Sequence, residues 1–279
     1  MPGIPCTWVG GQGLWYGSIT RSNMEETFFR MNLKKSLGQH FLRDENISRK
    51  IVAVLQERPF RRLLEVGPGG GALTKYLIEL NGVEFKAVEL DTEKIAFLEQ
   101  AYPVLQNKIL CSDFLKMDIP FEGRFTVVGN FPYNISTQIL FKVMDWKTQV
   151  EGMVGMFQKE VAQRVAAPAG NKVYGVISVL VQAFFMVEFL FEVHENCFSP
   201  PPKVKSAVIR LTPRLKEMDM RSEKDFFTLV KAAFNQRRKT LRNAVRPLFA
   251  PEILQEALFD RRAEQLSVAD FAALTYKMK

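Results

Sequence analysis

The chain of 279 residues is 47% hydrophobic and 24% charged, which supports a packed globular core of one large or two smaller domains. No apolar run approaches the roughly 20 residues of a membrane-spanning helix. Three cysteines without a CxxC pair and two histidines argue against a disulfide framework or a metal site. We therefore expect a cytoplasmic protein, and its net charge of +8 predicts an anionic partner such as nucleic acid.

The N-terminal segment differs from the rest of the chain. Residues 1–31 begin with a stretch rich in Gly and Trp and show neither helical nor strand periodicity. Because Met24 and Met31 are alternative starting points, we expect this extension to be disordered or to result from a misplaced translation start. The motif at residues 37–42 also fits no strand or helix period.

From Lys50 onward, short apolar runs alternate with amphipathic segments, a pattern that predicts β-α repeats around a mostly parallel sheet. The apolar run at residues 173–191 is expected to form a buried strand or helix. Strands are expected at residues 62–66, 84–90, 108–111, 125–129, 151–157 and 207–211, and helices at 72–80, 92–100, 136–146 and 159–166.

The pattern changes around Pro213. Apolar residues then follow helical spacing over residues 226–234, and further helices are expected at 251–258 and 268–276. We therefore predict an α/β domain over residues 32–213 and a small all-α domain over residues 214–279.

Acidic residues lie at the ends of the second and third expected strands, and a glycine-rich turn follows the first. The turn at residues 67–71 lets backbone amides reach a ligand at a helix N-terminus. Glu89 can accept hydrogen bonds from ribose hydroxyls. Asp113 can accept from an adenine amino group while Phe114 packs on the ring, although Asp113 also suits a helix N-cap or turn. These residues alone do not decide between S-adenosylmethionine and a nicotinamide cofactor.

The tetrapeptide at residues 130–133, Asn-Phe-Pro-Tyr, follows the fourth strand, and in open α/β sheets ligands bind at this end. The Asn130 side-chain carbonyl and the backbone carbonyl of Pro132 can both accept hydrogens from one amino group, and Tyr133 offers a ring face to a base. Such a clamp would aim the nitrogen lone pair at an electrophile. The alternative is an ordinary strand-to-turn junction.

Two basic groups are candidates for contact with RNA phosphates. The first is expected to continue the helix that begins near residue 226, and a solvated helix face is the alternative explanation for it. Its members are Arg237, Arg238, Lys239, Arg242 and Arg246, and the second group consists of Lys203, Lys205, Arg210 and Arg214.

Six motifs in this order resemble the KsgA family of S-adenosylmethionine-dependent small-subunit ribosomal RNA adenine N6,N6-dimethyltransferases. The resemblance spans about residues 32–262. The motifs are Leu-Gly-Gln-His-Phe-Leu at 37–42, Glu-Val-Gly-Pro-Gly at 65–69, Glu-Leu-Asp at 89–91, Asn-Phe-Pro-Tyr at 130–133, Phe-Ser-Pro-Pro-Pro-Lys-Val at 198–204 and Arg-Arg-Lys-Thr-Leu-Arg at 237–242.

The resemblance implies a Rossmann-like methyltransferase domain followed by a small helical domain, with Asn130, Pro132 and Tyr133 catalytic and with Phe198 helping Tyr133 to hold the target base. Phe131 stands where Leu or Ile is usual and is expected to contribute through its backbone, and His40 stands where many members have Asn. The implied cofactor-binding residues are Gln39, His40, Leu42, Gly67, Gly69, Glu89, Leu90, Asp113, Phe114 and Asn130. The implied RNA-binding residues are Lys203, Lys205, Arg237, Arg238, Lys239 and Arg242.

The implied substrate is a pair of adjacent adenosines in a hairpin loop near the 3′ end of 16S rRNA, within an immature 30S particle. We expect a monomer that needs no metal and serves small-subunit biogenesis. One alternative is a large-subunit adenine methyltransferase of the macrolide-resistance type. Others are a noncatalytic ribosome-assembly factor, which the intact tetrapeptide disfavours, and a nicotinamide oxidoreductase, for which no catalytic acid is evident.

Overall fold

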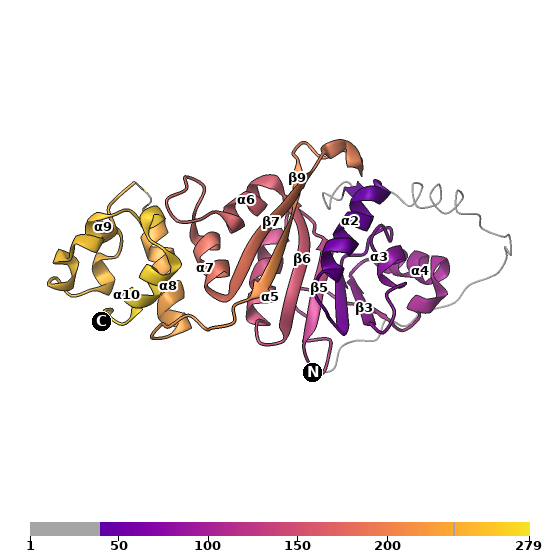
Figure 1. The fold of residues 1–279 in the computed structure, drawn as a ribbon, viewed down its shortest axis with the longest axis horizontal. Coiled ribbons are helices and arrows are strands. Elements are labelled where there is room, and N and C mark those ends of the chain that lie inside the picture. The colour runs from indigo at the N-terminus through magenta and orange to yellow at the C-terminus, as the bar shows by residue number, and fades with distance from the viewer. Residues whose placement is uncertain (1–39, 237) are drawn as a thin grey trace.

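The structure is a computed structural model that describes residues 40–236 and 238–279. The expected N-terminal extension, Gln39 and Arg237 lie outside the described residues. A seven-stranded sheet has the order β4-β3-β2-β5-β6-β9-β7 (Figure 1). Strands β4, β3, β2, β5 and β6 run parallel to one another, and β9 is antiparallel to both of its neighbours, β6 and β7. The prediction of a mostly parallel sheet is therefore confirmed. The strands are β2 (Arg62–Val66), β3 (Glu84–Glu89), β4 (Ile109–Cys111), β5 (Phe125–Asn130), β6 (Val150–Gln158), β7 (Phe185–Val193) and β9 (Ser206–Pro213).

Successive strand residues face two different apolar clusters, as the two-residue period of a strand requires. Leu63 packs in one cluster and Leu64 in the other, and the same alternation separates Val127 from Val128. The sheet is therefore covered on both faces. One face carries α2 (Glu45–Gln56), α3 (Thr74–Leu77) and α4 (Thr92–Ala101), and the other α5 (Ser136–Asp145), α6 (Lys159–Ala166) and α7 (Val176–Phe184).

Three local differences from the sequence predictions have physical reasons. The helix expected at 72–80 shortens to α3, because the chain turns tightly on both sides, with positive φ at Gly71 and Gly82. The apolar run at 173–191 divides into the buried helix α7 and then β7, whose residues between Phe185 and Val193 are exposed or half-buried. Both segments are strongly apolar, so periodicity alone could not separate them. No prediction covered α2, whose N-terminus is capped by the Asp44 carboxylate accepting from the backbone amides of Asn46 and Ile47.

Arg210 is a structural residue and not a free cation of the basic surface, which corrects the sequence interpretation. Its side chain is 7% exposed, and its guanidinium donates to the carbonyl of Val54 at 3.0 Å and pairs with Glu57 and Glu188. A buried charge needs such partners, so Arg210 fastens the C-terminal end of α2 to β7 and β9. Arg214 is engaged as well, donating from Nε to the carbonyl of Gln182 at 2.6 Å.

The C-terminal helices lie together at the end of the molecule opposite α4 (Figure 1). They are α8 (Glu223–Asn235), α9 (Leu241–Ala244) and α10 (Val268–Thr275). The predicted helix at 251–258 is wrong: two 3₁₀ turns, Ile253–Gln255 and Ala257–Asp260, are separated by Glu256 in extended conformation. The helix also does not continue through the basic run, because α8 ends at Asn235 and the chain turns before α9.

One apolar cluster joins the helical region to the sheet. It contains Leu64 and Val127 of the sheet, Leu180 of α7, and Phe226 and Phe271 of α8 and α10. The two parts therefore share a continuous core, and the domain boundary placed after residue 213 stays a prediction.

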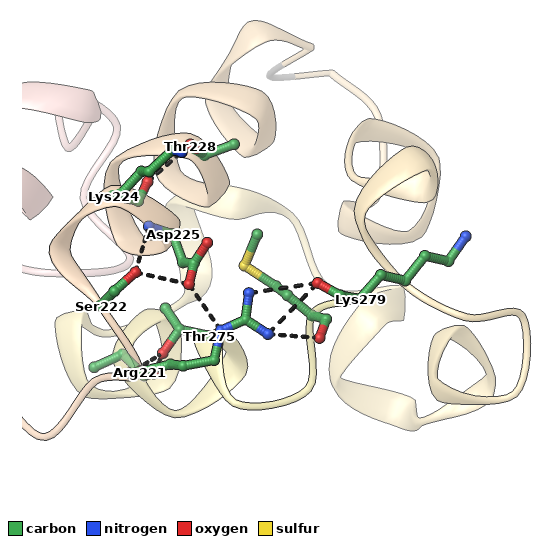
Figure 2. A network of polar contacts seen from close by, with 9 residues as sticks. Arg221, Ser222, Lys224, Asp225, Thr228, Thr275 and Lys279 are labelled. Carbon is green, nitrogen blue, oxygen red and sulfur yellow. Dashed lines mark hydrogen bonds and ion pairs between the residues drawn. The ribbon is translucent and has the colours of Figure 1, made fainter.

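A polar network fastens the described C-terminal residues to the start of α8 (Figure 2). Arg221 donates to the carboxylate of Asp225 at 2.7 Å and to the backbone carbonyl of Met278 at 2.8 Å. Ser222 caps the helix by accepting from the backbone amide of Asp225 at 3.1 Å. The hydrogen bonds from Arg221 and Ser222 lower the pKa of Asp225 to about 2.

A short antiparallel ribbon, which periodicity did not indicate, brings the N-terminal part of the described chain to the sheet. It pairs β1 (Phe41–Leu42) with β8 (Phe198–Ser199), and the amide of Arg43 donates to the carbonyl of Cys197 at 2.8 Å. Two motifs that lie about 160 residues apart in the sequence thereby become neighbours.

Neither a membrane-spanning helix nor a metal-binding cluster occurs among residues 40–236 and 238–279. No helix there is both long and apolar enough to cross a bilayer. No group of three or more His, Cys, Asp or Glu side chains there is arranged to hold a metal ion.

Candidate active site

The candidate site lies where the parallel strands β3, β2 and β5 end side by side. Strand β2 pairs with β3 on one side and with β5 on the other, so the chain order reverses at this point. Such a reversal opens a crevice at the carboxyl ends of the strands, which is where open α/β sheets bind ligands. Gly67, Glu89 and Asn130 occupy these three strand ends, as the sequence analysis predicted.

The turn after β2 has the backbone that only glycine adopts without strain. Gly67 and Gly69 have φ angles of 70° and 56°. A Cβ on Gly67 would meet no atom within 4 Å, whereas one on Gly69 would lie 3.5 Å from the ring of Phe41. The ring of Phe41 thus lies over the turn and belongs to the site, although the sequence analysis did not single it out.

Glu89 is a buried carboxylate at the centre of the crevice, with 8% of its surface exposed. Its Oε2 accepts from the amide of Gly69 at 3.4 Å, and its Oε1 from the amides of Leu90 and Asp91 at 2.9 and 3.1 Å. Two oxygens offer about four lone-pair sites, so the carboxylate can accept further hydrogen bonds. Beside it, Leu90 is 67% exposed and presents an apolar surface. The pair suits a ligand with a sugar hydroxyl next to a flat ring.

Asp113 and Phe114 lie beside Glu89, because the amide of Ser112 donates to the Glu89 carbonyl at 3.1 Å. One oxygen of Asp113 accepts from the amide of Leu115 at 3.0 Å, so the residue does form the turn that was its structural alternative. Phe114 is only 5% exposed and packs edge-on against Trp146, with ring centroids 5.3 Å apart. Little of this ring is accessible, and its contact with a cofactor ring stays a prediction.

The Asn130 side chain is oriented by the N-terminal ribbon. Its Nδ2 donates to the backbone carbonyl of His40 at 3.3 Å, which leaves Oδ1 available as an acceptor. The His40 ring is fixed in turn, because its Nδ1 donates to the carbonyl of Pro200 at 2.8 Å. The N-terminal motif therefore holds the Asn130 side chain directly, and the proline-rich loop holds His40.

The ring of Tyr133 is also held in place. Its hydroxyl lies 2.5 Å from the hydroxyl of Ser206, a fully buried residue at the start of β9, and its centroid lies 5.6 Å from that of His40. Burial raises the pKa of Tyr133. The sequence analysis missed Ser206, whose only signal is a hydroxyl at the start of an apolar strand. Phe198 is 4% exposed beside Leu42, so it offers a base little surface, and its stacking role stays a prediction.

Glu65 is a second acid that the sequence analysis did not interpret. It lies in β2 with 2% of its surface exposed, and its Oε2 accepts from the hydroxyl of Thr74 at 2.7 Å. Burial away from water, reinforced by the nearby charge of Glu89, raises the pKa of Glu65 to about 8. At neutral pH the crevice therefore holds a neutral carboxyl, that of Glu65, beneath the turn.

The predicted RNA-binding cations differ in how accessible they are. Lys203 and Lys205, which follow the proline-rich loop, and Arg238 and Lys239, between α8 and α9, are exposed. Arg242 is engaged, because its Nε donates to the carbonyl of Leu254 at 2.7 Å and its guanidinium pairs with Asp260 at 2.8 Å.

The fold and the strand-end residues define a class, a Rossmann-like domain that binds a cofactor with a ribose, and the family match identifies it as a methyltransferase that uses S-adenosylmethionine. The family model described as ribosomal RNA adenine dimethylase matches residues 30–278, and the chain belongs to this family.

Relatives agree with this assignment, and solved structures share the fold. The chain is 50% identical to a ribosomal RNA small subunit methyltransferase A of Cytophaga hutchinsonii, over 88% of this chain and 97% of that one. It is 47% identical to the protein of the same name from Flavobacterium johnsoniae, over 90% and 97%. A dimethyladenosine transferase from Plasmodium falciparum shares the fold with a TM-score of 0.71 and 24% identity, over 83% of this chain and 94% of that one. The 23S rRNA methyltransferase ErmE shares it with a TM-score of 0.66 and 23% identity, over 84% and 99%.

We predict that Glu89→Gln weakens S-adenosylmethionine binding by about 10- to 100-fold, because hydrogen bonds to a charged acceptor contribute about 1.5–3 kcal/mol. Gln keeps one acceptor oxygen and replaces the other by a donor. Isothermal titration of the full chain with the cofactor measures the change. Glu93→Gln, an exposed position on α4, is the matched control. Equal affinities of the wild type and Glu89→Gln would remove Glu89 from the cofactor site.

Proposed function

We propose that the protein transfers methyl groups from S-adenosylmethionine to the N6 amino groups of two adjacent adenosines in small-subunit rRNA. The target is a hairpin loop near the 3′ end of 16S rRNA within an immature 30S particle in the cytoplasm, and the protein acts there as a monomer in small-subunit biogenesis. Membership of the adenine dimethylase family and the names of relatives 47–50% identical support this proposal.

The observation that carries the mechanism is the bond from Asn130 Nδ2 to the His40 carbonyl, which leaves Oδ1 available as an acceptor. The Pro132 carbonyl accepts from the amide of Ile135 at 3.2 Å and keeps its second lone pair. These two acceptors hold both hydrogens of the adenine amino group, so its nitrogen is presented with the lone pair directed away from the ring. The base itself is turned out of its stack and rests on Tyr133.

The bound cofactor supplies an activated methyl group on a sulfonium, so the protein needs no strong base. The turn at Gly67 and Gly69 and the carboxylate of Glu89 hold the cofactor beside the clamp, because their strand ends adjoin. As the bond from nitrogen to methyl forms, the bond from methyl to sulfur would break and leave a neutral thioether, and the alkylated amino group would then lose its proton to water. After the first transfer the amino group carries one methyl group and one hydrogen. In the second transfer only one of the two acceptors can therefore bind a hydrogen of this nitrogen.

The accessible cations Lys203, Lys205, Arg238 and Lys239 provide the contacts with RNA phosphates. Contacts with phosphates do not depend on the base sequence, so the clamp and the shape of the RNA must select the target bases.

A transfer experiment tests the substrate. The protein is incubated with methyl-labelled S-adenosylmethionine and either immature small subunits or large subunits that lack methylation. We expect label in small-subunit RNA and none in large-subunit RNA. The reverse outcome would favour the macrolide-resistance type of enzyme. The fold alone does not separate the two, because the 23S rRNA methyltransferase ErmE shares the fold of this chain.

A further inference from the structure

Phe131 is the member of the tetrapeptide to which the mechanism gives no chemical role, yet its side chain is the most deeply buried of the four. Its surface is 1% exposed, and its ring packs against Phe157 with centroids 5.1 Å apart. Its amide donates to the carbonyl of Met156 at 3.2 Å, which continues the pairing of β5 with β6. The expectation that Phe131 acts through its backbone alone is therefore incomplete.

Two glycines make the space that this ring occupies. Gly129 of β5 and Gly155 of β6 stand opposite each other in register. A Cβ on Gly155 would lie 2.2 Å from Cε2 of Phe131, and one on Gly129 would lie 2.6 Å from Cε1 of the same ring. Both distances are far below van der Waals contact, so neither position admits a larger residue while the ring is in place. We call this space the glycine slot.

We propose that Phe131, seated in the glycine slot, is a positioning residue that sets the spacing between the Asn130 side chain and the Pro132 carbonyl. The inference rests on the proposed function. Phe131 lies between Asn130 and Pro132, which supply the two acceptors, and the chain leaves the sheet at this point. A ring locked between two strands fixes the backbone on both sides of it. Gly155 touches none of the reacting groups and acts by leaving room for the Phe131 ring and for Phe157, whose Cε2 a Cβ would meet at 2.8 Å.

The test is a pair of substitutions with a rescue. Gly155→Ala displaces the ring, and a shift of about 1 Å at a reacting centre can cost on the order of 100-fold in rate. We expect a loss of about that size in single-turnover methyl transfer at saturating cofactor, with cofactor affinity unchanged within about twofold. Phe131→Leu removes the Cε atoms that collide and lets Phe157 relax into the vacated volume. The double variant should recover to within a few-fold of Phe131→Leu alone.

Two further glycine variants serve as controls. Gly152→Ala lies on the same strand, and its Cβ would be no closer than 3.7 Å to any atom, so it should transfer methyl groups at the wild-type rate. Gly129→Ala would also meet the backbone carbonyl of Val66 at 2.7 Å, which Phe131→Leu cannot relieve, so this variant should not be rescued.

Melting temperatures test the packing of the glycine slot independently of the proposed function. Gly155→Ala should melt roughly 5 °C below the wild type, and Phe131→Leu should reverse much of that loss. The inference is overturned if Phe131→Leu does not restore the melting temperature of Gly155→Ala, or if Gly155→Ala transfers methyl groups at the wild-type rate. A double variant that transfers methyl groups much more slowly than Phe131→Leu alone also overturns it. If the wild type transfers no methyl group to small-subunit RNA while the melting temperatures reverse as expected, the slot stands as a packing feature and the proposed function fails.

Discussion

Replacing Asn130 by Ala should reduce methyl transfer by at least about 100-fold, since removing one preorganised polar group from a reacting centre typically costs that much. The variant loses the Oδ1 acceptor, and the bond from Nδ2 to the His40 carbonyl disappears with it. RNA binding should remain near the wild-type level, because the exposed cations Lys203, Lys205, Arg238 and Lys239 are unchanged. Single-turnover transfer and binding to immature small subunits are measured side by side.

Asn134→Ala is the matched control, since this exposed asparagine lies four residues after Asn130, in the turn that follows β5. It should transfer at close to the wild-type rate. Asn130→Asp adds a sharper comparison, because it keeps an acceptor and loses the donor to His40. A rate between those of the wild type and Asn130→Ala is expected. Undiminished transfer by Asn130→Ala would contradict the clamp.

The stability of the protein should fall as the pH rises from 5 to 8, and Glu65 should be the reason. Its pKa is about 8 in the folded protein against 4.5 for an unperturbed carboxyl. Between these values the folded state holds a proton that the unfolded state has released, so unfolding becomes easier with increasing pH. The stabilisation is complete below pH 4.5 and lost above about pH 8, a change on the order of 5 kcal/mol.

Glu65→Gln removes this titration while retaining an oxygen that accepts from Thr74. The free energy of unfolding of the variant, measured in urea from pH 5 to 9, should depend less steeply on pH than that of the wild type. The difference between the two should reach several kcal/mol, with the variant relatively more stable at pH 8.5. Glu79→Gln, an exposed position after α3, controls for the loss of a carboxyl. Parallel curves for Glu65→Gln and the wild type would place the titration elsewhere.

The sequence predicts the strand ends well because glycine turns and polar residues interrupt strongly apolar runs. Glu89 and Asn130 could therefore be placed in one crevice from the order of the strands alone. Tertiary contacts were less accessible. The ribbon between Phe41–Leu42 and Phe198–Ser199 joins two-residue strands, which carry no period to detect.

Side-chain roles that depend on a distant partner were also hidden. Arg210 looks like a cation of the surface in the sequence, and only the positions of Glu57 and Glu188 show that it is buried and paired. Ser206 gains meaning only from its contact with Tyr133. Phe131 is uninformative until Gly129 and Gly155 are seen to face each other across neighbouring strands.

Mass spectrometry of small-subunit RNA after reaction with the protein and S-adenosylmethionine tests the central claim most directly, because it reports the site and the number of methyl groups together. We predict two methyl groups on N6 of each of two adjacent adenosines in a hairpin loop near the 3′ end. Methyl groups on a different base, on large-subunit RNA alone, or no more than one on each adenosine would contradict the account.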